Sequence, residues 1–415
     1  MSRRHFMSHL SGSAAAAAAS MTMGGAVLAN ADEMRKRRKS AILLWMGGGP
    51  ATIDIWDLKP DAPTGGPFRP ISTSGDMQIC EHLPMLAKQM QHLSIVRSMS
   101  TREADHNRGR YYMHTGYVPN PNIEHPGYGS VIAHELIEQR PELEIPPFVS
   151  IGGGTTGPGF LGMAWSPFSV SSNGRVRNLA GGKDGKSRLQ SRMAALEAIE
   201  SGFMSRTRGT PASEHAKVLG KTFDLMTSDQ MQAFRVETEP DEVKERYGTN
   251  GFGQGCLLAR RLVEAGVPFV EVDLGGWDNH NNIHPTLKDT KLPQLDRAYS
   301  ALVEDLVQRG MWEDTVVIWM GEFGRTPRIN QNAGRDHFAR AWSCVVGGGD
   351  LRGGIAVGKT SSDGMAVETE PYSSEDLMTT VCKGLGISTD KTFTSKNGRP
   401  MKIAGGGKLI GDLVG

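Results

Sequence analysis

The apolar run AILLWM at residues 41–46 is followed at once by GGGP at residues 47–50. Six consecutive apolar residues predict a strand that is covered on both faces, which is typical of a parallel sheet. The glycines and the proline then end the strand and allow a tight turn. We therefore expect the fold to be built around a fully buried strand near the start of the chain.

Strand-like and helix-like patterns alternate along much of the remaining sequence. Amphipathic stretches predict helices, and short apolar runs that end in glycine predict strands. The expected strands are 93–97, 269–274, 315–320 and 342–346, and the expected helices are 254–265, 294–308 and 374–384. This alternation predicts an α/β fold with a mostly parallel sheet flanked by helices. Residues 188–247 are polar and helix-prone, and we interpret them as a helical insertion.

The N-terminal region shows the features of an export signal in their usual order. Arg3 and Arg4 precede a weakly apolar stretch at residues 10–28, and the small-residue site ANA follows at residues 29–31. This order predicts a twin-arginine signal peptide at residues 1–31, with an ordinary alanine-rich helix as the alternative. The export interpretation predicts the twin-arginine machinery as a partner, a periplasmic or secreted location, and no membrane-spanning segment after cleavage.

The rest of the chain, residues 32–415, has a length and composition that suit one large α/β domain. The 415-residue sequence has a formal net charge of +1, and its basic residues form no broad basic face. Nucleic-acid binding proteins usually show such a face, so we expect no nucleic-acid partner.

Acidic and imidazole side chains follow several of the expected strands. Asp54 follows the first strand, Asp278 and His280 follow the strand at 269–274, Glu322 follows the strand at 315–320, and His337 lies in the next loop. Ligands of parallel sheets bind beyond the carboxyl ends of the strands. We therefore expect these side chains to meet along one edge of the sheet.

Carboxylates and imidazoles without a thiolate indicate a divalent metal, and the share of histidine favours zinc or another transition metal. Some of the residues have other interpretations. Asp54 also suits a turn or a helix cap, Asp336 suits a residue that orients His337, and His284 remains open as a ligand.

A separate segment, residues 105–117, combines two histidines and two arginines. On a helix His106 and Arg110 are four residues apart and share a face. An arginine in that position would bind an oxyanion through paired hydrogen bonds. The alternative interpretation is a plain surface helix.

The sequence resembles the domain-of-unknown-function family 1501, a group of exported proteins in the alkaline-phosphatase-like superfamily. The residues that carry the resemblance are Gly48-Gly49-Pro50 with Asp54, Asp57-Leu58-Lys59-Pro60, His106 with Thr115-Gly116-Tyr117, Gly276-Trp277-Asp278-Asn279-His280, Gly321-Glu322-Phe323-Gly324-Arg325-Thr326-Pro327 and Gly334-Arg335-Asp336-His337-Phe338. The resemblance implies an alkaline-phosphatase-like fold that binds divalent metal at its strand ends.

By the same resemblance, Asp278 and His280 correspond to an Asp–His metal pair, Glu322 to a metal-binding acid and His337 to a final histidine. His106 and Arg110 fall where sulfatases place their modified nucleophile and its partner arginine. Gly48 and Phe323 depart from the superfamily pattern, because each stands where a metal ligand is usual. These departures favour a one-metal site, or a His nucleophile or base at position 106.

Together these patterns predict an exported, metal-dependent hydrolase that acts on a phosphate, sulfate or related ester. Its catalytic residues would be His106, Arg110 and Arg325, and the anionic ester or polymer would be the substrate. The alternative is a non-catalytic exported protein that keeps the fold and part of the metal site but binds a polymer or a protein partner.

Overall fold

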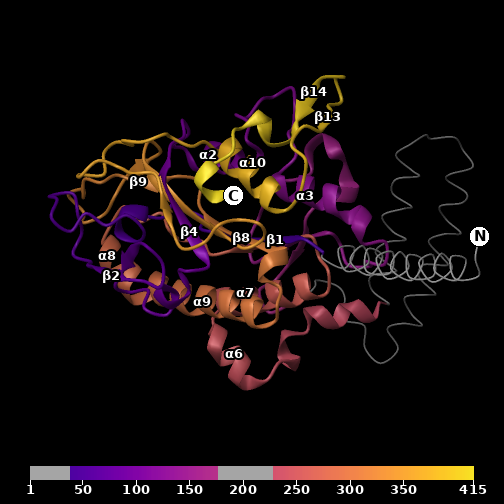
Figure 1. Cartoon of the computed structure of the whole chain (residues 1–415), viewed down its shortest axis with the longest axis horizontal. Helices are drawn as coiled ribbons and strands as arrows, with labels where there is room; N and C mark the ends of the chain where they lie inside the picture. The colour runs from indigo at the N-terminus through magenta and orange to yellow at the C-terminus, as the bar shows by residue number, and fades with distance from the viewer. Residues whose placement is uncertain (1–37, 176–227) are drawn as a thin grey trace, which may run out of the picture. The chain divides into compact units, whose positions relative to one another are not determined.

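An eight-stranded sheet lies at the centre of the computed structural model, which describes residues 38–175 and 228–415 (Figure 1). The strand order is β12-β4-β11-β8-β1-β7-β5-β6. The strands are β1 (Ser40–Trp45), β4 (Leu93–Met99), β5 (Phe148–Ile151), β6 (Phe168–Val170), β7 (Phe269–Asp273), β8 (Thr315–Met320), β11 (Trp342–Gly347) and β12 (Ala356–Val357).

The sheet is mostly parallel, as the sequence predicts. Within this sheet β11 alone runs antiparallel to its neighbours, β4 and β8. The other paired strands run parallel to one another. Helices cover both faces, so the expected α/β class is confirmed.

Strand β1 occupies a central place because it pairs with both β7 and β8. All six of its residues are buried. Ile42 and Leu44 belong to one hydrophobic core, whereas Leu43 and Trp45 belong to a second core. Side chains alternate between the two faces of a strand, so an unbroken apolar run is what a strand between two cores requires.

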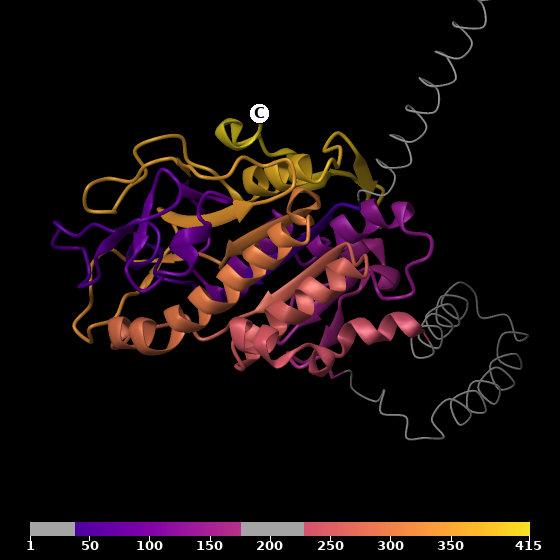
Figure 2. The same cartoon turned by 60° about the horizontal axis from the view of Figure 1, so that its bottom comes forward.

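The helices divide between these two cores (Figures 1 and 2). One face of the sheet packs against α7 (Gly251–Glu264) and α9 (Leu292–Gln308). The other packs against α2 (His106–Thr115), α3 (Tyr128–Leu136) and α10 (Ser374–Gly384). The predicted helices at 254–265, 294–308 and 374–384 correspond to α7, α9 and α10.

Two of these helices begin earlier than the sequence pattern indicates. Helix α7 begins at Gly251 because the Asn250 side chain accepts a hydrogen bond from the Gly253 N–H at 3.0 Å and so caps the first turn. Helix α9 begins at Leu292 and is preceded by a π-helical turn, Leu287–Lys291. Neither the side-chain cap of α7 nor the π-helical turn before α9 can be recognised from amphipathic periodicity.

Two predicted segments fall wholly or partly outside the described residues. They are the export signal at 1–31 and residues 188–227 of the helical insertion. The described end of the insertion contains the 3-10 turns Asp229–Phe234 and Val236–Thr238 and the helix α6 (Asp241–Tyr247). Among the described residues, no helix has the length and apolar character needed to cross a membrane.

The topology brings three chain segments to one edge of the sheet. β8, β1 and β7 are adjacent and parallel, so the loops that follow them emerge side by side. After β8, the short strands β9 (Gly324–Arg325) and β10 (His337–Phe338) pair antiparallel, with His337 opposite Arg325. This edge carries most of the residues singled out in the sequence.

Candidate metal centre

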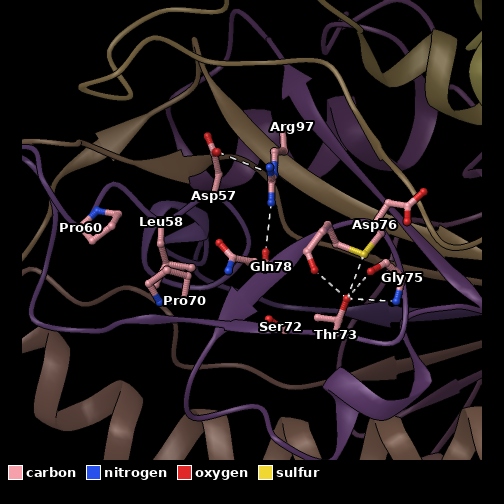
Figure 3. A pocket seen from close by; sticks show the side chains of 11 residues that line it. Asp57, Leu58, Pro60, Pro70, Ser72, Thr73, Gly75, Asp76, Gln78 and Arg97 are labelled. Carbon is pink, nitrogen blue, oxygen red and sulfur yellow. Dashed lines mark hydrogen bonds and ion pairs between the residues drawn. The ribbon is translucent and has the colours of Figure 1, made fainter.

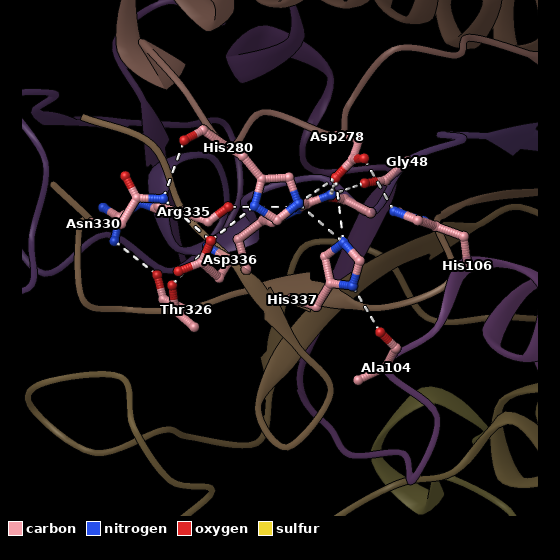
Figure 4. Close-up of polar contacts among 12 residues, drawn as sticks. Gly48, Ala104, His106, Asp278, His280, Thr326, Asn330, Arg335, Asp336 and His337 are labelled. Carbon is pink, nitrogen blue, oxygen red and sulfur yellow. Dashed lines mark hydrogen bonds and ion pairs between the residues drawn. The ribbon is translucent and has the colours of Figure 1, made fainter. Parts of the chain in front are cut away.

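His106, Asp278 and His337 meet at this edge although they lie far apart in the sequence (Figure 4). They come from the first residue of α2, the loop after β7 and strand β10. His106 Nε2 lies 3.3 Å from Asp278 Oδ2, and His337 Nε2 lies 3.3 Å from Asp278 Oδ1. One ligand atom from each residue falls within 4.8 Å of the others. We call these three residues the cluster.

The rings of His106, His337 and His280 are held in the same way, through Nδ1. A neutral imidazole has one N–H and one lone pair, so an acceptor facing Nδ1 assigns the lone pair to Nε2. The acceptors are Glu322 Oε1 for His106 at 2.7 Å, Ala104 O for His337 at 2.7 Å and Asp336 Oδ1 for His280 at 2.8 Å.

As a result, the Nε2 lone pairs of His106 and His337 face the oxygen lone pairs of Asp278. His280 Nε2, which accepts from Arg325 Nη1, lies 3.2 Å from His337 Nε2. Within the described chain, His106 Nε2 and Glu322 Oε2 are buried and have no hydrogen-bond partner. Two imidazoles and a carboxylate match the donor set of a transition-metal site with open positions. The residues present therefore fit a divalent ion.

Arg325 supplies a fixed positive charge beside the cluster. Its side chain is 0% exposed. The guanidinium donates to Asp278 Oδ1 and to four other acceptors, so its donors are directed at the protein rather than at a bound molecule. Those acceptors are Gly48 O, Gly49 O at 2.7 Å, Arg335 O at 3.2 Å and His280 Nε2 at 3.2 Å.

The charge state of Asp278 follows from these neighbours. Burial raises the pKa of this carboxyl group, but the hydrogen bond and the positive charge of Arg325 outweigh that effect. His106 and His280 act in the same direction, and the pKa falls to about 2. Asp278 is therefore ionised at neutral pH and available as a ligand.

Gly48 joins the turn after β1 to this centre. Its φ of +115° is one that side-chain-bearing residues rarely adopt. An added Cβ would lie 2.6 Å from the Asp278 nitrogen, so the loop after β7 can pack here only against glycine. The Gly48 N–H donates to Glu322 Oε1 at 2.9 Å, which fixes the carboxylate that holds His106.

Asp54, expected among the metal ligands, does not reach the cluster. Its two oxygens accept from Arg335 Nε at 2.8 Å and Nη2 at 2.7 Å, and His284 Nε2 lies 3.4 Å from Oδ1. Both side chains of the ion pair are buried, at 1% and 0% exposure. Burial raises the pKa of Asp54, but the bonds to His284 and Arg335 outweigh burial and lower it. Its lone pairs are thus occupied by the protein's own cation.

The structure also changes the roles expected of two acidic residues. Glu322 lies behind His106 and binds its Nδ1, so it orients a ligand instead of facing the cluster centre. Asp336, interpreted as a partner of His337, binds His280 instead. The backbone carbonyl of Ala104 takes the corresponding place beside His337, and no sequence pattern marks such a carbonyl.

Arg110 lies one helical turn beyond His106, on the rim of the site. Its side chain is 35% exposed. Nη1 donates to Gly154 O at 3.0 Å, and Nη2 lies 3.5 Å from Asp273 Oδ2. The guanidinium also lies 5.4 Å from the centre of the Trp45 ring. Arg110 therefore keeps access to solvent, which Arg325 lacks.

Two residues that shape this edge received no role from the sequence, namely Asp273 and Arg335. Asp273 is the last residue of β7, and a carboxylate at the carboxyl end of a central strand is a signal that could have identified it. Arg335 lies two residues before the candidate ligand His337, but the surrounding sequence gives no sign of a partner 281 residues away.

A pocket of about 500 Å³ opens elsewhere, between the turn after β1 and the β2 (Pro70–Ser72) and β3 (Gln78–Cys80) hairpin (Figure 3). Its lining includes Asp57 and Arg97 but none of the cluster residues. Asp57 lies 3.0 Å from Lys59 Nζ and 3.7 Å from Arg97 Nε, and it accepts from the Thr360 hydroxyl. These contacts give Asp57 a structural role.

The sequence matches one protein family. A family model described as "Protein of unknown function (DUF1501)" matches residues 38–414. No curated protein matches the sequence.

Several solved structures are similar over most of the chain. They include the PsFucS1 sulfatase from Pseudoalteromonas sp. (TM-score 0.40, 11% identity, 88% of this chain and 71% of that one), a protein in the alkaline phosphatase superfamily from Vibrio parahaemolyticus (0.38, 13%, 89% and 69%) and the phosphonate monoester hydrolase of Agrobacterium radiobacter (0.38, 12%, 91% and 77%). Similarity at this level does not decide function, so function has to be derived from the site.

Proposed function

We propose a function for this chain from its site, because the chain belongs to the DUF1501 family, whose description assigns none. The protein is a metal-dependent hydrolase of phosphate, sulfate or related esters. The observation that supports this proposal is the convergence of His106 Nε2, His337 Nε2 and both Asp278 oxygens, with the imidazole lone pairs directed inward. Three protein ligands and an open position are the arrangement of catalytic zinc sites, whereas structural sites are closed by four.

The ligands would be His106, Asp278 and His337, and the ion would be zinc or another transition metal. When bound, such an ion would polarise the ester group and lower the pKa of an attacking water. Glu322 and the Ala104 carbonyl hold the two imidazole rings in the orientation that binding requires. His106 therefore acts as a ligand in this proposal, not as the nucleophile or base that its sequence position allows.

The cations of the site favour an anionic substrate group. Arg325 is buried against Asp278 and cancels that carboxylate's charge. Arg110, half-exposed on the same helix face as His106, is the cation that a phosphoryl or sulfuryl group can reach. The alternative, a non-catalytic binding protein, uses the same cluster without turnover.

The decisive experiment combines elemental analysis of the purified protein with assays on aryl phosphate and aryl sulfate esters. We expect about one transition-metal ion per chain, by the three-ligand count, and turnover that a chelator abolishes and metal restores. Metal without turnover of any ester would favour the binding protein. Neither metal nor turnover would reject the proposal.

A matched pair of variants ties the result to the cluster. Asp278→Asn keeps the shape of the side chain but removes the anionic ligand, so metal and turnover should be lost together. Asp289→Asn removes the same charge from an exposed position and should change neither. Equal metal content and turnover in the two variants would show that the metal does not bind at the cluster.

We also propose that the protein acts after export, because the sequence has the twin-arginine pattern and small-residue site of residues 1–31. Expression in a bacterial host should yield a periplasmic product whose first residue is Asp32. Replacing Arg3 and Arg4 by lysine should retain the protein in the cytoplasm. A full-length product with its N-terminus intact would contradict the proposal.

A further inference from the structure

Asp273, the last residue of β7, borders the cluster without belonging to it. Its Oδ2 lies 3.5 Å from Arg110 Nη2. Arg110 and His106 are four residues apart on α2, so they lie on the same face of the helix, one turn from each other. The carboxyl group of Asp273 is thus placed on the substrate side of the site, next to the cation that we assign to the anionic group.

The turn after β1 shows how close this pair is to the cluster. An added Cβ on Gly47 would lie 3.2 Å from Arg110 Nη2 and 3.4 Å from Asp273 Oδ2. The next residue, Gly48, donates to Glu322, which holds His106. The Cα atoms of Gly47 and Gly48 are about 3.8 Å apart. Gly47 lies against Asp273 and Arg110, and Gly48 binds the carboxylate that orients His106.

The loop after β5 packs closely on this carboxyl group at Gly153, where an added Cβ would lie 2.8 Å from Asp273 Oδ2, but the loop is open at the next residue. Among the described residues, an added Cβ on Gly154 would meet no atom within 4 Å. An added Cβ on Gly275 would meet only Asp273 Oδ1, at 3.3 Å. The Asp273 side chain is 16% exposed, and the open space lies at Gly154 and Gly275, where the remainder of a bound ester would extend.

The surroundings keep a proton on Asp273 more readily than on an ordinary aspartic acid. Burial raises the pKa of Asp273, and the charges of Glu271 on β7 and Glu322 after β8 raise it further. Arg110 and His114, both on α2, act in the opposite direction but do not cancel the effect. Lys291, whose ammonium donates to Gly275 O at 2.6 Å, also interacts with the Asp273 carboxyl group.

Ester cleavage needs a group that stabilises the leaving oxygen. In two-metal sites the second ion does so. Here the second positive charge beside Asp278 is Arg325, whose donors are bound to protein acceptors. A proton donor is the other general solution.

We propose that Asp273 is the general acid that protonates the leaving alcohol, an inference that rests on the hydrolase function proposed above. The oxygen of water forms a bond to phosphorus or sulfur while the bond to the ester oxygen breaks. The Asp273 proton moves to that ester oxygen, and the attacking water releases a proton to solvent. The products are the alcohol and the phosphate or sulfate, and the Asp273 carboxylate regains its proton from water.

The test compares leaving groups in the metal-loaded, full-length protein. Asp273→Asn should lower kcat/KM for a methyl or other alkyl ester by roughly 10²–10⁴-fold, the usual contribution of a general acid. The 4-nitrophenyl ester of the same acid has a leaving group that needs no proton, so its kcat/KM should fall by about tenfold or less. Metal content should stay that of wild type. Asp289→Asn, at an exposed position, is the control and should alter neither ester.

The pH profile gives an independent readout. Wild-type turnover of the alkyl ester should decline as pH rises through the pKa of Asp273, and this limb should be missing in Asp273→Asn. Asp273→Glu, which keeps an acid, should retain part of the alkyl-ester activity and serves if the Asn variant does not fold.

The outcomes separate this inference from the proposed function. Equal losses on both esters would overturn the general acid, because a merely structural residue does not distinguish leaving groups. Wild-type protein that binds metal but hydrolyses neither ester would overturn the hydrolase function, and the general acid with it. Wild-type turnover of both esters with the alkyl ester unaffected by Asp273→Asn would overturn the general acid alone.

Discussion

Two acid–base arrangements lie at the same edge of the sheet and differ in one respect. In the first, Asp54 is buried and both of its oxygens are bound to Arg335. In the second, the cluster of His106, Asp278 and His337 is partly exposed, and the Nε2 atoms of its two histidines both face the Asp278 carboxylate. In the first arrangement an arginine binds both carboxylate oxygens, whereas in the second Arg325 binds only Oδ1 of Asp278.

The difference shows that residue type alone does not mark a metal site. Asp54 and Asp278 are both acids in loops that follow central strands, and each has a histidine nearby. The two acids differ in how many of their carboxylate oxygens already accept hydrogen bonds from an arginine. A carboxylate with a bidentate arginine has little left for a metal, whereas lone pairs that converge in a half-buried space are costly unless a cation joins them.

Removing a cluster ligand should have the largest effect on metal content and turnover. His337→Ala leaves two of three ligands, so metal content should fall well below one ion per chain. A lost metal removes several kcal/mol of transition-state stabilisation, and turnover should decrease roughly thousandfold or more. The free energy of unfolding of the metal-free protein should hardly change. His92→Ala, a half-buried histidine away from the cluster, is the control and should retain both metal and turnover.

The opposite result is expected on the Asp54 side. Asp54→Ala leaves the Arg335 guanidinium buried without its anion, which should lower the free energy of unfolding by about 3–5 kcal/mol. The folded fraction should still bind metal. Denaturant titration measures the first quantity and elemental analysis the second, with Asp289→Ala as a surface control within about 0.5 kcal/mol of wild type. If Asp54→Ala lost metal but not stability, Asp54 would be a ligand after all.

Much of the fold could be predicted because burial on both faces leaves a direct trace in the sequence. Strand β1 is apolar from Ala41 onward, since Ile42 and Leu43 face different cores. The start of α7 could not be found in this way, because it depends on a hydrogen bond from the Gly253 N–H to the Asn250 side chain and not on periodicity. The antiparallel direction of β11 also escaped prediction, since an apolar run has no direction.

The site was predictable in its position but not in its division of roles. Asp278 and His280 are recognisable because acids and imidazoles follow a central strand. Their partners come from elsewhere: Arg325 meets Asp278 across 47 residues and Arg335 meets Asp54 across 281. Which carboxylate is taken by an arginine is decided by such long-range contacts, and a single sequence contains no record of them.

A smaller effect should come from the residues behind the cluster. Glu322→Gln keeps the acceptor for the Gly48 N–H but weakens the acceptor for His106 Nδ1. Metal affinity should fall about 10–100-fold, the usual result of changing such a partner. Competition with a chelator measures it, and Glu368→Gln, an exposed acid, should leave it unchanged. A complete loss of metal would instead make Glu322 a direct ligand and place it inside the cluster.

The smallest effect concerns acid stability, and it separates the two carboxylates by burial. The pKa values of Asp54 and Asp278 are both lowered in the folded protein. Each therefore stabilises the fold above its unfolded pKa of about 3.9, and this contribution is lost as pH falls through the lower, folded pKa. The reason is that the unfolded chain binds the proton first.

One such carboxylate changes the free energy of unfolding by at most about 1.4 kcal/mol per pH unit. Asp54 is shielded from solvent, whereas the Asp278 side chain is 45% exposed, so water screens its ion pair. Unfolding of metal-free protein between about pH 5 and pH 2 should therefore depend less steeply on pH in Asp54→Asn than in wild type. Asp278→Asn should reduce the slope by less. An equal reduction in both variants would mean that burial does not distinguish the two carboxylates, and that the Asp54–Arg335 pair is more open to water than its packing indicates.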